Sequence, residues 1–187
     1  IYGCLVGSEM CIRDSYEAVV RINSQSGKGG VAFLLEKDHG VSLPRRLQIS
    51  MSQKIQKIAD ETGKEISTSE IWEIFHTNFV MPKSGHSFKN YSLKTSDTAD
   101  VSDHIKAEIE IDGKNHEISG SGNGPIDAFV NALNQKLSID IKVSDYHQSA
   151  ISSGSDAQAA AYIELQKGEK TSWGVGINRN TTKASFE

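Results

Sequence analysis

Residues 104–133, "HIKAEIEIDGKNHEISGSGNGPIDAFVNAL", decide the fold of this chain. Apolar and polar residues alternate along the first part and then reach Asp112-Gly113, a dipeptide typical of a tight turn between antiparallel strands. Glycines at alternate positions (Gly120, Gly122 and Gly124) lead into Pro125, which suits the first turn of a helix. The stretch therefore predicts strand, hairpin turn, strand and then a helix over about residues 125–136.

The second half of the chain repeats this plan. Four residues recur at a spacing of 54: Ile109, Glu110, Gly120 and Gly122 are followed by Ile163, Glu164, Gly174 and Gly176. A further strand precedes each hairpin, in "FKNYSLKTSD" (88–97) and "IDIKVSDYHQ" (139–148). The pattern predicts an α+β fold with two βββα units, over about 86–136 and 137–187, and we expect the second unit to be truncated in its helix. We expect them to pack with pseudo-twofold symmetry, their helices covering one face of the sheets.

The part of the chain before these units has helical signals. "SLPRRLQISMSQKIQKIADETG" (42–63) predicts a helix with Ser42 as its cap, Pro44 in its first turn and Gly63 at its end. Its apolar residues form one stripe: Leu47, Met51, Ile55 and Ile58. A second helix is predicted at "STSEIWEIF" (67–75), where Ser67 and Glu70 have capping-box spacing. We expect a helical linker subdomain over 16–80, and a second domain over 81–187.

The net charge gives no support for binding to nucleic acid or to a membrane. The chain has 187 residues, 37% of them hydrophobic and 24% charged, and a net charge of −4. Binding to nucleic acid or to a membrane surface calls for a basic face, which this charge does not support.

The first fifteen residues, "IYGCLVGSEMCIRDS", contain both cysteines, Cys4 and Cys11. The stretch resembles a translated sequencing-adaptor sequence, and we expect residues 1–15 to be a disordered artefact. A secretory signal is not indicated, because a basic start is missing and Glu9 interrupts the apolar run. The remainder contains no cysteine, and we expect a cytoplasmic protein.

Three glycine- or alanine-rich stretches are candidate binding loops. "SQSGKGG" (24–30) has backbone amides and Lys28 for an anion, but it departs from the phosphate-loop pattern and no helical pattern follows at once. "GSGNGP" (120–125) departs from the dinucleotide fingerprint, yet amides at a helix start favour a carboxylate. "SSGSDAQAAAYIEL" (152–165) has small residues that suit the wall of a pocket. The alternatives are a surface loop, a structural turn and tight helix-on-sheet packing, respectively.

Catalytic patterns are missing from the sequence. The six histidines have no metal-ligand spacing, and neither a G-x-S-x-G motif nor a cysteine nucleophile outside the adaptor-like stretch is present. We therefore predict no catalytic residue, no metal ligand and no cofactor in this chain.

Residues 16–187 resemble, nearly end to end, the C-terminal part of 2-isopropylmalate synthases. The match is carried by the stretch from "RINSQSGKGG" to "GKEIS" (21–67), by "GSGNGPIDAFVNAL", by "DAQAAAYIEL" and by "WGVGIN". The resemblance implies an acyltransferase of leucine biosynthesis whose metal-dependent catalytic barrel lies outside this sequence. The chain would then be inactive alone and would be a homodimeric regulatory domain that binds leucine as feedback inhibitor.

The same resemblance implies which residues bind leucine. They comprise a glycine loop with the start of the following helix, and an apolar wall: Gly122, Asn123, Gly124, Ile126 and Asp127, with Val143, Tyr146, Ala150 and Ala157. Amides would take the carboxylate, and small or branched residues the isobutyl group. Two alternatives remain open: an isoleucine-sensing domain of the kind found in citramalate synthases, and a dimerisation module without a ligand.

Overall fold

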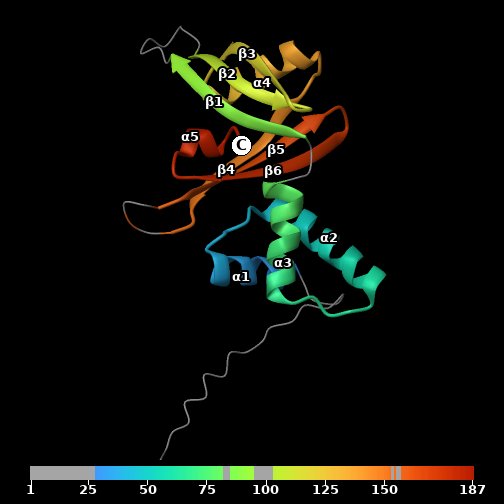
Figure 1. Ribbon diagram of the computed structural model, residues 1–187. Coiled ribbons are helices and arrows are strands. Elements are labelled where there is room, and N and C mark those ends of the chain that lie inside the picture. Colours follow the sequence, from blue (N-terminus) through green and yellow to red (C-terminus); the bar gives the residue numbers. More distant parts are fainter. Residues whose placement is uncertain (1–27, 82–84, 95–102, 153, 155–156) are drawn as a thin grey trace, which may run out of the picture.

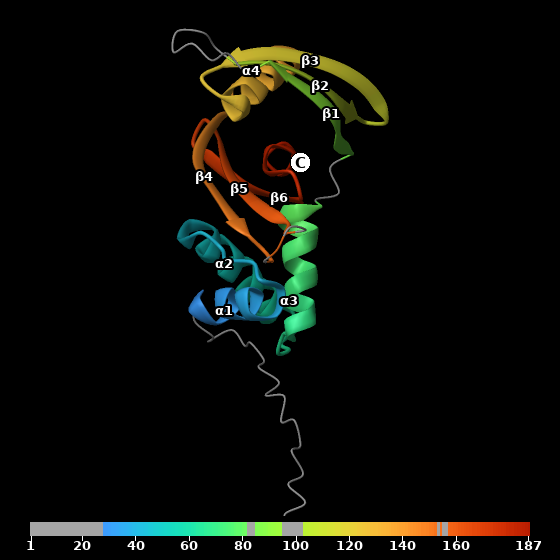
Figure 2. The same cartoon turned by 90° about the vertical axis from the view of Figure 1, so that its left-hand side faces the viewer.

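The computed structural model describes residues 28–81, 85–94, 103–152, 154 and 157–187. Its layers run from one three-stranded sheet, through the helices α4 and α5, to a second three-stranded sheet and then to a group of three helices (Figures 1 and 2). Residues 1–15, predicted to be disordered, lie outside the described residues.

The helical part comprises α1 (Lys28–His39), α2 (Arg45–Thr62), α3 (Thr68–Phe75) and a π-helical turn η1 (His76–Val80). The predicted capping box is confirmed, because the Ser67 hydroxyl accepts from the Glu70 amide and the Glu70 carboxylate accepts from the Ser67 amide. Gly63 ends α2 in the left-handed conformation, as predicted. Ser42 is not the cap of α2, because Pro44 occupies that position and no side chain caps the helix.

Helix α1 corrects another expectation. It begins at Lys28 and includes Gly29, so a helix does follow the "SQSGKGG" stretch. Glycine is unfavourable in a helix, but Val31, Leu34 and Leu35 of α1 are buried against the other helices. Tertiary packing thus outweighs the local preference. Residues 24–27 of the stretch lie outside the described part of the chain.

The two βββα units have the same architecture. The first consists of β1 (His86–Lys94), β2 (Asp103–Ile111), β3 (Lys114–Gly122) and α4 (Pro125–Leu137). The second consists of β4 (Lys142–Ala150), β5 (Ala159–Lys167), β6 (Lys170–Asn178) and α5 (Thr181–Ala184). Each sheet is an antiparallel meander, in the order β1-β2-β3 and β4-β5-β6. The predicted duplicated fold is confirmed.

The spacing between the units is 56 residues and not the predicted 54, because β1, β2, β3 and α4 each begin 56 residues before β4, β5, β6 and α5. A contact supports this alignment: an added Cβ would press against the Ala128 carbonyl at Gly120 and against the Ala184 carbonyl at Gly176. The difference between 54 and 56 did not change which strand residues were predicted to face the core. A shift of two residues preserves the alternation of side chains along a strand.

The β2–β3 hairpin turns at Asp112 (φ 49°) and Gly113 (φ 76°), as the sequence predicted. Two consecutive positive φ angles match the twist of the flanking strands. The inner face of this sheet packs on α4, with buried Ile105, Ile109 and Ile118 against Phe129.

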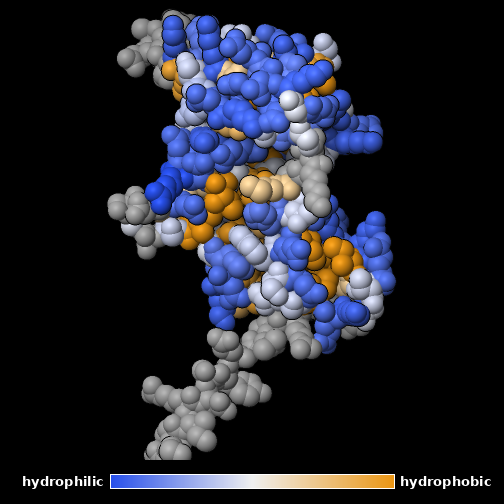
Figure 3. Space-filling model, viewed as in Figure 1, coloured by the Kyte–Doolittle hydropathy of each residue, from blue (hydrophilic) through white to orange (hydrophobic). Residues whose placement is uncertain are grey.

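The outer faces of the two sheets differ. On the second sheet, Ala160, Tyr162, Trp173 and Val175 are buried in one apolar core with residues of α1, α2 and α3. The equivalent positions of the first sheet are exposed and polar: His104, Lys106, Glu117 and Ser119. The surface over the first unit is mainly hydrophilic in the view of Figure 3. The helices therefore cover the second sheet, and burial there raises the pKa of the Tyr162 phenol above its ordinary value.

An ion pair and a close backbone approach join the helices to the second unit. Arg46 of α2 forms an ion pair of 2.7 Å with Glu164 of β5, whose side chain is 4% exposed. The charge of a buried carboxylate calls for such a partner. Gly40, after α1, lies directly against the carbonyl of Ile151, which follows β4.

We predict that Gly40→Ala destabilises the chain more than Gly63→Ala does. Both glycines have left-handed φ angles (68° and 65°), so an alanine at either position is strained by about 1–2 kcal/mol. Only at Gly40 would the methyl group also overlap the Ile151 carbonyl, whereas nothing lies within 4 Å at Gly63. Overpacking adds about 1–3 kcal/mol. Urea unfolding of both variants measures the difference, and equal losses would contradict the Gly40 contact.

Candidate functional site

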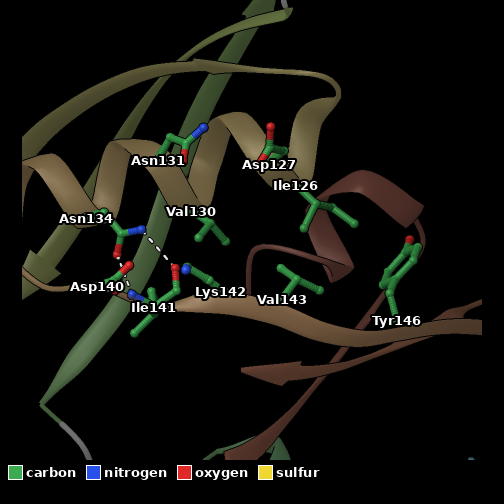
Figure 4. Close-up of a pocket in the computed structure, with 10 residues that line it drawn as sticks. All are labelled: Ile126, Asp127, Val130, Asn131, Asn134, Asp140, Ile141, Lys142, Val143 and Tyr146. Atoms are coloured by element: carbon green, nitrogen blue, oxygen red, sulfur yellow. Dashed lines mark hydrogen bonds between the residues drawn. The ribbon is translucent and has the colours of Figure 1, made fainter. Parts of the chain in front are cut away.

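A groove of about 550 Å³ lies between α4 and β4, where the two units meet (Figure 4). Its walls are mainly apolar: Ile126 and Val130 of α4 face Val143 of β4, with Tyr146 at one end. The complete lining also includes Asp127, Asn131, Asn134, Asp140, Ile141 and Lys142. This volume lies within the range of small-molecule sites, which commonly combine apolar walls with a few polar groups.

Helix α4 supplies one wall because its apolar residues point in two directions. Phe129 and Leu133 pack with the core of the first sheet, and Val130 is turned toward β4. Ile126 does both, because it packs against that core and also lines the groove. Pro125 stands at the first position of the helix, as the sequence predicted. The helix thus joins the first sheet to the groove.

Strand β4 supplies the opposite wall. The Tyr146 side chain is 38% exposed, and its hydroxyl lies 3.2 Å from the Ser185 hydroxyl beyond α5. The side-chain amide of Gln148 donates to the Thr181 carbonyl and to the Ser185 hydroxyl. These bonds hold β4 against α5.

The Asn134 side chain holds the loop that joins α4 to β4 at one end of the groove. Asn134 of α4 donates to the Ile141 carbonyl (2.8 Å) and accepts from the Ile141 amide (2.9 Å) (Figure 4). This pair of hydrogen bonds sets the separation of α4 and β4 at that end of the groove.

The glycine loop before α4 has its own internal partner. The Asn123 amide donates to the Asp127 carboxylate (2.9 Å), so it is already occupied. An added Cβ at Gly122 would lie 2.5 Å from the Ala128 nitrogen and 2.5 Å from the Asp127 carboxylate. Close packing against α4 therefore accounts for Gly122 and for Gly120. The predicted alternative, a structural turn, does not account for them, because both lie in β3 without a left-handed φ.

The structure brings four of the nine predicted binding residues together in the groove: Ile126, Asp127, Val143 and Tyr146. Figure 4 shows Asp127 and Asn131 directed away from Val143, so they belong to the rim. Gly122, Asn123 and Gly124 adjoin the start of α4 without lining the groove. Ala150 ends β4, and Ala157 lies in the loop between β4 and β5; neither lines the groove.

Six lining residues were absent from the sequence-based prediction of the site. The apolar pattern of α4 had indicated that Val130 is buried, but not that it faces a groove. Asn134, Asp140, Ile141 and Lys142 lie in or beside the α4–β4 connection, whose path depends on tertiary structure. Asn131 donates to the Ser121 carbonyl and so ties α4 to β3.

Within the described ranges, no group of three or more His, Cys, Asp or Glu side chains is arranged to hold a metal ion. No helix in these ranges is both long and apolar enough to cross a membrane.

Comparison with known proteins identifies the family. The model of the LeuA allosteric (dimerisation) domain matches residues 65–187, from just before α3 to the end of the sequence. This chain belongs to the LeuA allosteric (dimerisation) domain family. A second model, for an alpha-isopropylmalate synthase post-catalytic domain-like region, matches residues 9–36.

Curated relatives of the LeuA-domain chain are 2-isopropylmalate synthases, which confirms the predicted resemblance. Those of Parafrankia sp. (strain EAN1pec) and Mycobacterium ulcerans are each 47% identical over 175 residues. The protein of Thermobifida fusca is 44% identical over 173 residues. Each match covers 92% of this chain but only 30–31% of the relative. The chain thus spans about a third of the length of these relatives.

We predict that Asp127→Ala destabilises the LeuA-domain chain by about 1 kcal/mol, because the Asn123 amide and the first turn of α4 lose their carboxylate. Asp127→Asn is the matched variant, since its amide oxygen can still accept from Asn123. We expect a smaller loss of unfolding free energy for Asp127→Asn than for Asp127→Ala. Amide exchange at Asn123 should accelerate only in the alanine variant, and unchanged exchange there would refute the assignment.

Proposed function

We propose that this chain is the C-terminal regulatory part of a 2-isopropylmalate synthase, and that it binds leucine as a feedback inhibitor between α4 and β4. The apolar groove at the junction of the two units carries the proposal. It is supported by the allosteric (dimerisation) family and by relatives named 2-isopropylmalate synthase. The complete enzyme condenses acetyl-CoA with 2-oxoisovalerate on a divalent metal in a separate catalytic barrel. The chain forms a homodimer and has no synthase activity alone.

The groove has the chemistry that a branched amino acid requires. Ile126, Val130 and Val143 provide aliphatic contacts for an isobutyl group. Asp127 at the rim offers a carboxylate for the ligand ammonium, and Lys142 offers an ammonium for the ligand carboxylate. Because Asp127 already occupies the Asn123 amide, that amide is not the carboxylate partner unless Asp127 moves.

Strand β4 is the element that would transmit binding to the helices. It carries the groove residues Val143 and Tyr146, and its Ser149 hydroxyl lies 3.2 Å from the hydroxyl of Tyr162, a residue buried under the helices. Just beyond the strand, the Ile151 carbonyl lies against Gly40. A ligand that biases the position of β4 therefore has a contiguous path to α1 and α2.

We predict that titration calorimetry on this chain detects one leucine per chain, with isoleucine at least tenfold weaker. Moving the branch point of the ligand changes its fit to a preformed apolar wall by about 1–3 kcal/mol. Sedimentation equilibrium measures the accompanying dimer. Tighter binding of isoleucine would favour a citramalate synthase-type domain. A dimer that binds neither amino acid would refute the sensor function and leave a dimerisation module.

We further predict that leucine slows amide hydrogen exchange in α1 and α2, and that Gly40→Ala removes this response while calorimetry still detects leucine. The reason is that the added methyl group displaces the Ile151 carbonyl from α1. Gly63→Ala is the control, because it introduces similar backbone strain without that contact. Leucine binding to the unmodified chain without any change in helix exchange would exclude this path.

A further inference from the structure

The duplicated fold contains a second place equivalent to the groove. The common spacing of 56 residues and the matching contacts Gly120–Ala128 and Gly176–Ala184 align α4 with α5. Val130 of α4 is therefore equivalent to Phe186, just beyond α5, and Ile126 is equivalent to Thr182.

The strands opposite these helices can be aligned as well. The pairing of β1 shifts register after Phe88, and that of β4 shifts after Val143. Past each irregularity, a side-chain oxygen accepts from the next amide: Asn90 from Tyr91 (2.8 Å) and Asp145 from Tyr146 (2.9 Å). Phe88 pairs with Ile109 and Val143 with Leu165, whose spacing is the common 56. Phe88 and Tyr91 are thus equivalent to the groove residues Val143 and Tyr146, at a spacing of 55 within these two strands.

The two equivalent places differ in what occupies them. Between Val130 and the pair Val143 and Tyr146 lies the open groove. At the equivalent place, between α5 and β1, the ring of Phe186 reaches β1. Its centroid lies 5.7 Å from that of Phe88 and 5.2 Å from that of Tyr91. It also stacks on Phe129 at 4.6 Å and is only 6% exposed. The Phe186 ring therefore fills the space between α5 and β1, whereas the smaller Val130 leaves the equivalent space between α4 and β4 open.

We propose that the fold has a latent second binding position for a branched aliphatic amino acid, between α5 and β1, which the Phe186 side chain fills. One chain consequently binds one effector. The inference rests on the proposed function for the class of ligand, but its structural basis is the equivalence of Val130 and Phe186. The rim charge is reversed, because Lys183 is equivalent to Asp127, and Lys183 pairs with Glu187 at 3.7 Å. The latent position would bind leucine more weakly, with its carboxylate near Lys183.

Reciprocal substitutions test the proposal by leucine titration calorimetry on the 187-residue chain. Phe186→Val gives the second unit the valine that the first unit has at position 130. We expect the stoichiometry to rise from one leucine per chain toward two. Val130→Phe does the reverse, and we expect leucine binding to fall by at least a hundredfold. The double variant should bind one leucine again, at the opened position.

Phe186 belongs to an aromatic cluster, so thermal melting must show that each variant is folded. Phe186→Leu retains more apolar contact and is the second variant. A folded Phe186 variant that still binds a single leucine would overturn the inference while leaving the proposed function intact. Full leucine affinity in a folded Val130→Phe chain would overturn it as well.

The unmodified chain provides a measurement that needs no substitution. Nuclear Overhauser effects from bound leucine should reach the methyl groups of Val130 and Val143 and not the rings of Phe88 and Tyr91. Contacts to those rings would show that Phe186 does not close the second position. An unmodified chain that binds neither leucine nor isoleucine would instead refute the proposed function, and the latent site with it.

Discussion

The arrangement of this molecule depends on two places where a helix backbone packs directly on a glycine of a strand: α4 on β3 and α5 on β6. At Gly120 and Gly176 the helix backbone lies so near the strand that a Cβ would collide with it. This proximity positions α4 on the inner face of the first sheet and α5 on that of the second. The groove exists because α4, held in this way, presents Ile126 and Val130 to the neighbouring unit.

The two halves share an architecture but make different external contacts. Apolar residues on the outer face of the second sheet, Tyr162 and Trp173 among them, form one core with the helices. The first sheet has polar residues at the equivalent positions. Of the residues that the structure describes, those of the second half share the core of the helices, and β4 of that half also lines the groove. The duplicated domain is therefore asymmetric. The groove lies between its halves, and among the described residues the helices share a core with the second half.

Much of this fold was predictable, because the signals are local. The Asp112-Gly113 turn, the Ser67–Glu70 capping box, the end of α2 at Gly63 and the start of α4 at Pro125 each depend on a few adjacent residues. Helix α1 was missed because its glycines oppose helix formation locally while its leucines favour it through distant packing. The spacing of the repeat was misjudged by two residues, since a period of two hides such a shift.

The candidate site was less predictable than the fold. The resemblance to a family indicated both sides of the groove, and Ile126, Val143 and Tyr146 do line it. The sequence did not show that Asp127 occupies the Asn123 amide, because both a ligand cradle and a close-packed turn require glycines. Nor did it show the role of Asn134, whose partner Ile141 is placed only by the fold.

The two hydrogen bonds between Asn134 and Ile141 have a consequence for the free energy with which the groove could bind a ligand. Two hydrogen bonds hold one end of the groove at a fixed width before anything enters, so little conformational entropy is lost there on association. At the other end, Tyr146 is partly exposed and is held by a single hydroxyl contact. If the groove binds a ligand as proposed, the end held by Asn134 would set the shape that the ligand must match, and the Tyr146 end would have more freedom to adjust.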